Sequence, residues 1–171
     1  MIDWLYSKLA VLIASFLMLG SLVGLLGAVN GSLRGMQAET VAQRVAEVLD
    51  GMASTEGETA TTISIATPGN RGTLPRTIAR EPYFLQIYWD SVWVYREAQP
   101  DRPWRIAPLL HSVYTASPPI DGDFSAVNLT ALEASARADG LRILPLRDIQ
   151  VARVWGVAEG QPAYLTFVYA P

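Results

Sequence analysis

Histidine is the side chain that most often acts as a general base, and this chain has a single one, His111. A catalytic histidine needs a nucleophile such as serine on one side and a carboxylate to orient it on the other. The sequence contains no G-x-S-x-G motif, and Leu110–Val113 around His111 has the pattern of a strand. We therefore expect His111 to pack in or beside a sheet, and we predict neither catalytic residues nor an enzymatic activity.

The sequence also lacks a motif that would bind a metal ion or a cofactor. The chain has no cysteine, which excludes disulfides, thiolate metal sites and cysteine nucleophiles. Asp121 and Asp123 resemble a fragment of a calcium loop, but the EF-hand pattern needs a third ligand, a glycine and a later glutamate at fixed spacing. An ordinary turn is the better interpretation of Asp121-Gly122-Asp123. We expect no metal, no cofactor and no small-molecule substrate.

Aromatic residues are the remaining candidates for recognition. Trp89, Trp93, Tyr95 and Trp104 surround a predicted hairpin, and the first three share the parity of one sheet face. One interpretation is an exposed surface for a protein or glycan partner. The other is cross-strand packing, which these residue types favour.

The stretch Leu9–Val29 predicts that the chain is attached to a membrane. It carries no charge, and its roughly 21 residues would rise about 32 Å as a helix, which matches the hydrocarbon core of a bilayer. A cleaved signal peptide usually has a shorter apolar core, and an uncharged run of this length is rare in soluble cores. We predict a single membrane-spanning helix that is retained, so that the mature chain keeps Met1 or loses Met1 alone.

Small residues mark one side of this predicted span. Gly20, Gly24 and Ala28 lie four residues apart and so stack on one helix face. Such a face allows two helices to approach closely in lipid, although small residues are also common in membrane helices. Self-association through this face is the prediction.

An amphipathic segment follows over 30–56. Val41, Val45, Val48 and Met52 recur at helical spacing, and charged residues fill the opposite side. If Gly31 and Gly35 only bend the chain, one helix runs from about Leu9 to Ala53. The apolar stripe then needs a partner, which is either the chain's own folded domain or a neighbouring subunit.

Residues 57–171 change to the two-residue alternation of strands. We predict an α+β fold in four parts: a short segment 1–8, a span 9–29, an amphipathic helix 30–56 and a mainly antiparallel β domain 57–171 with one short helix. Thr130 with Glu133 predicts the capping box of that helix, and Asp139-Gly140 predicts its end. The expected strands are 61–66, 83–88, 91–95, 104–107, 109–114, 141–144, 149–157 and 163–169, with a loop at 99–103.

Charge limits the class of partner but does not decide the direction across the membrane. The formal net charge is −3 and no basic block occurs, so nucleic acid is not expected as a partner. Lys8 on one side and Arg34 and Arg44 on the other are too evenly balanced for the positive-inside rule. Asn128-Leu129-Thr130 is a possible glycosylation site, which favours an extracytoplasmic β domain at the cell surface.

The layout resembles the type IV pilin-like superfamily, including archaeal pilin-like membrane proteins. Gln37–Ala46 looks like the second half of a pilin-type helix, and Leu74–Ile78 with Glu81-Pro82-Tyr83 looks like the opening of such a head. The resemblance implies surface filament assembly or adhesion, with self-association or other pilin-like subunits as partners. The alternative is an anchored accessory protein whose β domain binds a protein or glycan.

One departure from the pilin pattern is informative. Ser7-Lys8-Leu9-Ala10 lacks the basic-Gly or basic-Ala junction at which pilins are processed, and no acidic residue follows before Glu39. The resemblance therefore implies an accessory or anchored protein rather than a major filament subunit.

Overall fold

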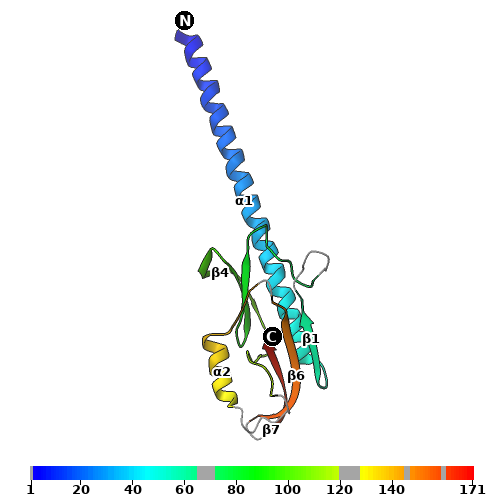
Figure 1. Cartoon of the computed structure of the whole chain (residues 1–171). Helices are drawn as coiled ribbons and strands as arrows, with labels where there is room; N and C mark the ends of the chain where they lie inside the picture. Colours follow the sequence, from blue (N-terminus) through cyan, green and yellow to red (C-terminus); the bar gives the residue numbers. More distant parts are fainter. Residues whose placement is uncertain (1, 65–71, 120–127, 145–146, 159–160) are drawn as a thin grey trace. The chain divides into compact units, whose positions relative to one another are not determined.

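The structure is a computed structural model, and it describes residues 2–64, 72–119, 128–144, 147–158 and 161–171. The chain divides into two units, 1–36 and 37–171. It is an α+β protein with a long amino-terminal helix, one further short helix and antiparallel sheets that form a β head (Figure 1). The predicted fold class is thereby confirmed.

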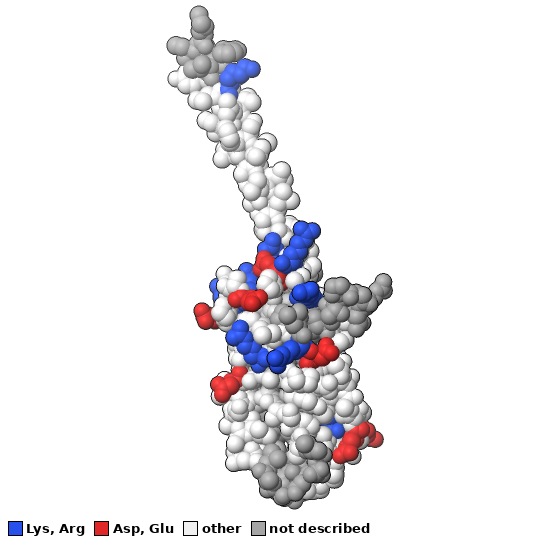
Figure 2. All heavy atoms as spheres, in the orientation of Figure 1, with Lys and Arg blue, Asp and Glu red and all other residues white. Residues whose placement is uncertain are grey.

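Helix α1, Ile2–Ser54, is continuous through Asn30-Gly31-Ser32, so this triplet does not break the helix. The part of α1 in the first unit is long and apolar enough to cross a membrane, with a mean hydropathy of 2.5 over its most apolar window. Figure 2 shows a long stretch of this part without charged side chains, as the sequence from Leu9 to Leu33 requires. Its apolar side chains are exposed, Met18 to 75%.

The second unit contains two antiparallel sheets. One has the strand order β1-β6-β7, built from β1 (Thr59–Ile63), β6 (Ile149–Ala158) and β7 (Gln161–Tyr169). The other has the order β4-β3-β2-β5, built from β4 (Gln99–Pro108), β3 (Ser91–Arg96), β2 (Tyr83–Ile87) and β5 (Leu141–Ile143). Figure 1 shows the last turns of α1 among these strands.

The core of the head is shared by α1 and both sheets. Ala38, Ala42, Val45 and Leu49 contribute fully buried side chains from the helix. Alternation along β2 places Leu85 and Ile87 in the same core, as predicted. Burial of these side chains is the main favourable contribution to folding of the head.

The predicted hairpin of 83–88 and 91–95 is confirmed, since β2 and β3 pair antiparallel with Leu85 opposite Val94. Two predictions between residues 99 and 114 were wrong, and β1 begins two residues before the predicted strand 61–66, whose last two residues lie outside the described residues. The predicted loop 99–103 is the first half of β4, an edge strand that tolerates Pro100 and Pro103 because an edge needs fewer backbone donors. The predicted strand 109–114 is absent, and Tyr114 alone forms a bridge, parallel to Phe167 of β7.

Helix α2, Leu129–Ala138, begins two residues earlier than predicted. Asn128 is its N-cap, because the side-chain oxygen of Asn128 accepts the Ala131 N–H at 3.0 Å. The predicted capping box of Thr130 and Glu133 is therefore wrong, and Glu133 instead pairs with Arg137 at 2.9 Å. Asp139 ends the helix as predicted.

Gly140 fixes the connection from α2 to β5. Its φ is +61°, and a Cβ at this position would lie 2.6 Å from the carbonyl oxygen of Ile87. Glycine is required there for both reasons. The turn is held further by Gln86, whose side-chain amide donates to the Asp139 carbonyl at 2.6 Å.

Candidate functional site

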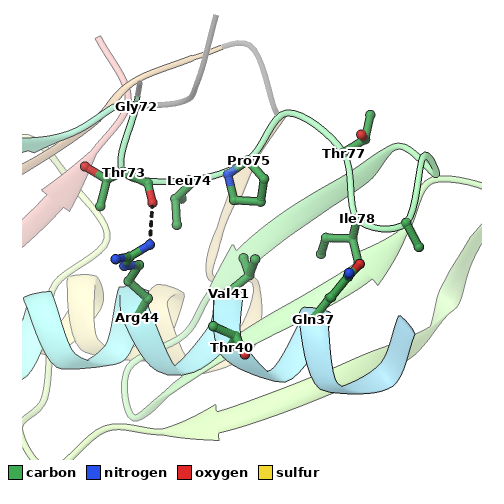
Figure 3. A pocket seen from close by; sticks show the side chains of 11 residues that line it. Gln37, Thr40, Val41, Arg44, Gly72, Thr73, Leu74, Pro75, Thr77 and Ile78 are labelled. Carbon is green, nitrogen blue, oxygen red and sulfur yellow. Dashed lines mark hydrogen bonds between the residues drawn. The ribbon is translucent and has the colours of Figure 1, made fainter. Parts of the chain in front are cut away.

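A groove of about 700 Å³ lies in the head between one face of α1 and the segment 72–79 (Figure 3). The helix contributes Gln37, Thr40, Val41 and Arg44. Leu74 and Ile78 reach down from the opposite segment and are each 1% exposed. The groove is thus lined mostly by polar side chains on the helix side and by apolar side chains on the opposite segment.

Two hydrogen bonds hold the segment above the groove. The guanidinium of Arg44 donates to the Thr73 carbonyl at 3.3 Å, as Figure 3 shows. The hydroxyl of Tyr83 donates to the Pro75 carbonyl at 2.6 Å. Burial raises the pKa of Tyr83 to about 12, so this phenol stays protonated and keeps donating at neutral pH.

A strained turn closes the end of the groove. Ala79 and Arg80 have φ of 51° and 67°, and Ile78 and Glu81 exchange two backbone hydrogen bonds of 2.9 and 3.0 Å across them. Two positive φ angles in succession define a type I′ turn, which usually contains asparagine, aspartate or glycine. The chain accepts this strain because Ile78 is buried on one side and Glu81 pairs with Arg96 on the other, at 3.8 Å.

The described lining of the groove lacks the side chains that most often carry acid–base chemistry. Its described lining holds one cation, Arg44, which already donates to Thr73, and it includes neither a carboxylate nor an imidazole. Proton transfer needs such a group within hydrogen-bond reach of the substrate.

The surroundings of His111 differ from the sequence-based prediction. His111 lies outside the described strands, and its side chain is 49% exposed. Asp50 of α1 accepts the backbone N–H groups of Leu110 and His111, each at 2.9 Å, and lies 3.4 Å from the His111 ring nitrogen Nδ1. The structure thus gives Asp50 the role of fastening segment 110–111 to the helix.

A second cavity, of about 490 Å³, lies at the carboxyl end of α1. Arg153 of β6 reaches this end of the helix, and its Nη1 donates to the carbonyl oxygens of Met52 (3.4 Å) and Ala53. The last carbonyls of a helix lack an i+4 partner, although the Thr55 N–H also donates to the Met52 carbonyl at 3.2 Å. A cation such as Arg153 also opposes the negative end of the helix dipole. Sequence analysis missed this role because Arg153 and Ala53 are 100 residues apart.

The predicted assembly stripe is covered by the chain itself. Val41 and Val45 are buried in the core of the head, and Val48 and Met52 pack against that core. Of the two partners considered for the stripe, the chain's own domain is the one found. The stripe is therefore not a free surface for a neighbouring subunit.

The small-residue face is exposed. A Cβ added to Gly20 or Gly24 would meet no atom within 4 Å, and Ala28 is exposed as well. Folding of the chain therefore does not require small residues here, so their spacing stays a prediction about helix packing.

The three predicted partner-surface aromatics do not form one exposed face. Tyr95 is 6% exposed because its ring stacks on Phe84, with centroids 4.9 Å apart and planes 3° from parallel. Trp93 lies beside Tyr95 with centroids 6.1 Å apart, whereas Trp89 packs edge-on against Tyr114 at 4.9 Å. The parity of Trp93 and Tyr95 was correct, but stacking within the sheet face buries most of this surface.

Two further predicted residues have different outcomes. Asn128 is exposed and its side-chain oxygen caps α2, whereas a glycan would be attached to the side-chain nitrogen, so glycosylation of Asn128 stays a prediction. Asp121 and Asp123 lie outside the described residues, and the described part of the chain contains no group of three metal-ligating side chains.

Comparison with protein-family models, with curated proteins and with solved structures finds no match to this chain.

Proposed function

We propose that this chain is a single-pass membrane protein of pilin-like organisation that works outside the membrane through its β head. The observation that carries the proposal is the contrast along α1. One uncharged part leaves every apolar side chain uncovered, and the next part is the central element of the head's core. A lipid environment is what such an uncovered apolar helix requires.

Polar side chains of the uncharged part also suit a lipid environment. The hydroxyls of Ser15 and Ser21 donate to the carbonyls four residues earlier, Val11 and Leu17, at 2.8 Å each. These bonds satisfy the hydroxyl donors within the helix, so that neither needs water. Anchoring through α1 is thus compatible with both serines of the predicted span Leu9–Val29.

Self-association would rest on the exposed face of Gly20, Gly24 and Ala28. The alternative stripe from Val41 to Met52 is unsuited to it because the head covers these residues. We therefore favour lateral contact between helices in the membrane, in surface assembly or adhesion, over packing through the second part of α1. No enzymatic step is included in the proposal.

A second candidate is an anchored accessory protein that binds a protein or glycan through its head. The groove beside Arg44 favours it, because Ala79 and Arg80 hold a costly backbone conformation at the groove's end. Strain of this kind is frequent where a protein shapes a binding surface. Filament recovery separates the two: presence in sheared surface filaments supports assembly, whereas one stoichiometric partner in detergent extracts supports the accessory role.

Topology is tested most directly by cysteine labelling, since the chain has no cysteine of its own. Thr62→Cys in β1 and Ser7→Cys before the span each introduce one thiol at an exposed position. A maleimide that cannot cross membranes should label Thr62→Cys in intact cells and Ser7→Cys only after lysis. The reverse pattern would refute the orientation, and recovery of both variants in the soluble fraction would refute anchoring.

A further inference from the structure

The cavity at the carboxyl end of α1 has the size and mixed lining of a small-molecule site, although no sequence motif pointed to it. Its volume of about 490 Å³ falls within the range of such sites. Ala53 supplies the helix end, and the remaining walls come from the segment 110–114 and from β6 and β7. The lining includes Trp89, Tyr114 and Tyr164 as rings, and His111, Ser112, Arg153 and Thr166 as polar side chains.

Arg153 has hydrogen-bonding capacity that the described residues leave unused. Its Nη1 is engaged by the Met52 and Ala53 carbonyls, but its Nε is fully buried and has no acceptor. A buried donor without an acceptor is costly. In the planar guanidinium, Nε and Nη2 form a second fork, whose geometry matches the two oxygens of a carboxylate.

Two carboxylates near this end of α1, Asp50 and Glu58, bind backbone N–H groups rather than Arg153. Asp50 accepts the N–H groups of Leu110 and His111, and Glu58 accepts the Trp155 N–H at 3.0 Å. Neither forms an ion pair with Arg153 among the described residues. Neither Asp50 nor Glu58 therefore serves as the acceptor of the second fork in this structure.

Apolar surface lies beside Arg153. The guanidinium carbon is 5.2 Å from the centre of the Tyr164 ring, and Tyr164 packs against Trp155 with centroids 4.7 Å apart. Leu110, which also lines the cavity, is 87% exposed. A ligand that reached Arg153 would thus lie against rings and an aliphatic side chain.

We propose that this cavity binds a small organic acid with an apolar body. Its carboxylate takes the Nε–Nη2 edge of Arg153, after a small shift of the atoms that now cover Nε. The Ser112 and Thr166 hydroxyls flank the carboxylate, and the apolar body lies against Tyr164, Trp89 and Leu110. The site lies within the head, so it does not depend on anchoring or assembly.

The test uses the full chain in detergent micelles and ¹⁹F NMR line broadening of 4-fluorophenylacetate. The neutral isostere 4-fluorophenylacetamide reports binding of the apolar body without the charge. We expect a Kd on the order of 1 mM for a ligand of this size. The amide should bind about tenfold more weakly, which is the effect of losing one charge-assisted pair.

Three substitutions test whether the ligand binds in this cavity. Arg153→Lys keeps the charge but loses the fork, and should weaken acid binding about tenfold. Tyr164→Ala, at a residue 39% exposed, should weaken acid and amide alike because both lose the ring. Arg105→Lys is the control, since Arg105 pairs with Glu39 at 3.8 Å outside the cavity lining.

The outcomes are separable. Equal affinity for acid and amide in the wild type, or unchanged acid binding by a folded Arg153→Lys, would overturn the proposal. Absence of broadening beyond that from empty micelles would overturn it too. If Arg153→Lys does not fold, Tyr164→Ala and the acid–amide comparison still decide. An acetylated tripeptide ending in phenylalanine, compared with its carboxamide, tells whether a peptide carboxyl end is also accepted.

Discussion

The two parts of α1 share one helical geometry but differ in what surrounds their apolar side chains. Leu22 in the first unit is 56% exposed, whereas Leu49 in the head is fully buried. The second part packs against two sheets of its own chain, and these sheets shield its apolar side chains from water. In the first unit the same residue type has no such cover among the described residues, which supports the membrane span that we propose.

Replacing one leucine by alanine in each part of α1 should give the largest difference in the free energy of unfolding. Leu49→Ala should lower the free energy of unfolding of the head by about 2–5 kcal/mol, because it removes buried methyl groups and leaves a cavity. Leu22→Ala should change it by no more than about 0.5 kcal/mol. Urea unfolding of the full chain in detergent, followed by tryptophan fluorescence, measures both. Equal losses would mean that the two parts are equally covered.

Unfolding at alkaline pH tests the burial of one tyrosine, Tyr83, inside the head. Burial raises the pKa of Tyr83 from 10.0 to about 12. The unfolded chain therefore releases this proton first, and the free energy of unfolding should be constant below about pH 10 and fall as pH rises towards 12. Urea unfolding between pH 8 and 11.5 measures the slope.

Tyr83→Phe is the matching variant. It should be less stable at pH 8 because it loses the bond to Pro75, and its decline above pH 10 should be shallower. Tyr95, whose pKa is also raised to about 12 by burial, keeps part of the slope. An identical slope in wild type and Tyr83→Phe would contradict the assignment.

The smallest effect on folding is expected at Gly24. Gly24→Ile should leave the free energy of unfolding of the head unchanged, because a Cβ there meets no atom within 4 Å. It should weaken association of residues 1–35 in a membrane two-helix assay, since bulk prevents close approach of two backbones. Leu25→Ile, one position round the helix, serves as the control. Equal association by wild type and Gly24→Ile would remove the small-residue face from the proposal.

Local pattern predicted most of the fold. The alternation of Leu85 and Ile87 placed β2 and its hairpin partner, and the apolar spacing of Val41 and Val45 identified the buried face of α1. The prediction of a loop at 99–103 was wrong because proline usually indicates a turn. Pro100 and Pro103 instead lie in an edge strand, where proline is tolerated. Asn128 and Thr130 are both good caps, and sequence alone chose the wrong one.

The sites were harder to predict because they depend on contacts distant in the sequence. In the sequence Arg153 has the pattern of an ordinary strand residue, and only the structure shows that it lies beside the end of α1. Asp50 belongs to the polar side of a helical pattern, yet it fastens Leu110 and His111 from 60 residues away. The burial of Tyr95 depends on stacking with Phe84 of the neighbouring strand, which alternation alone does not reveal.

The prolines of β4 have a consequence for molecules held close together. Pro100, Pro103 and Pro108 lie along the ten residues of this edge strand, and each lacks a backbone N–H. An incoming strand would find these donors missing, so β4 is a poor template for pairing with another chain. If the chain is anchored in a membrane, as we propose, its copies meet at high local concentration, and the prolines of this edge should then disfavour strand pairing between copies.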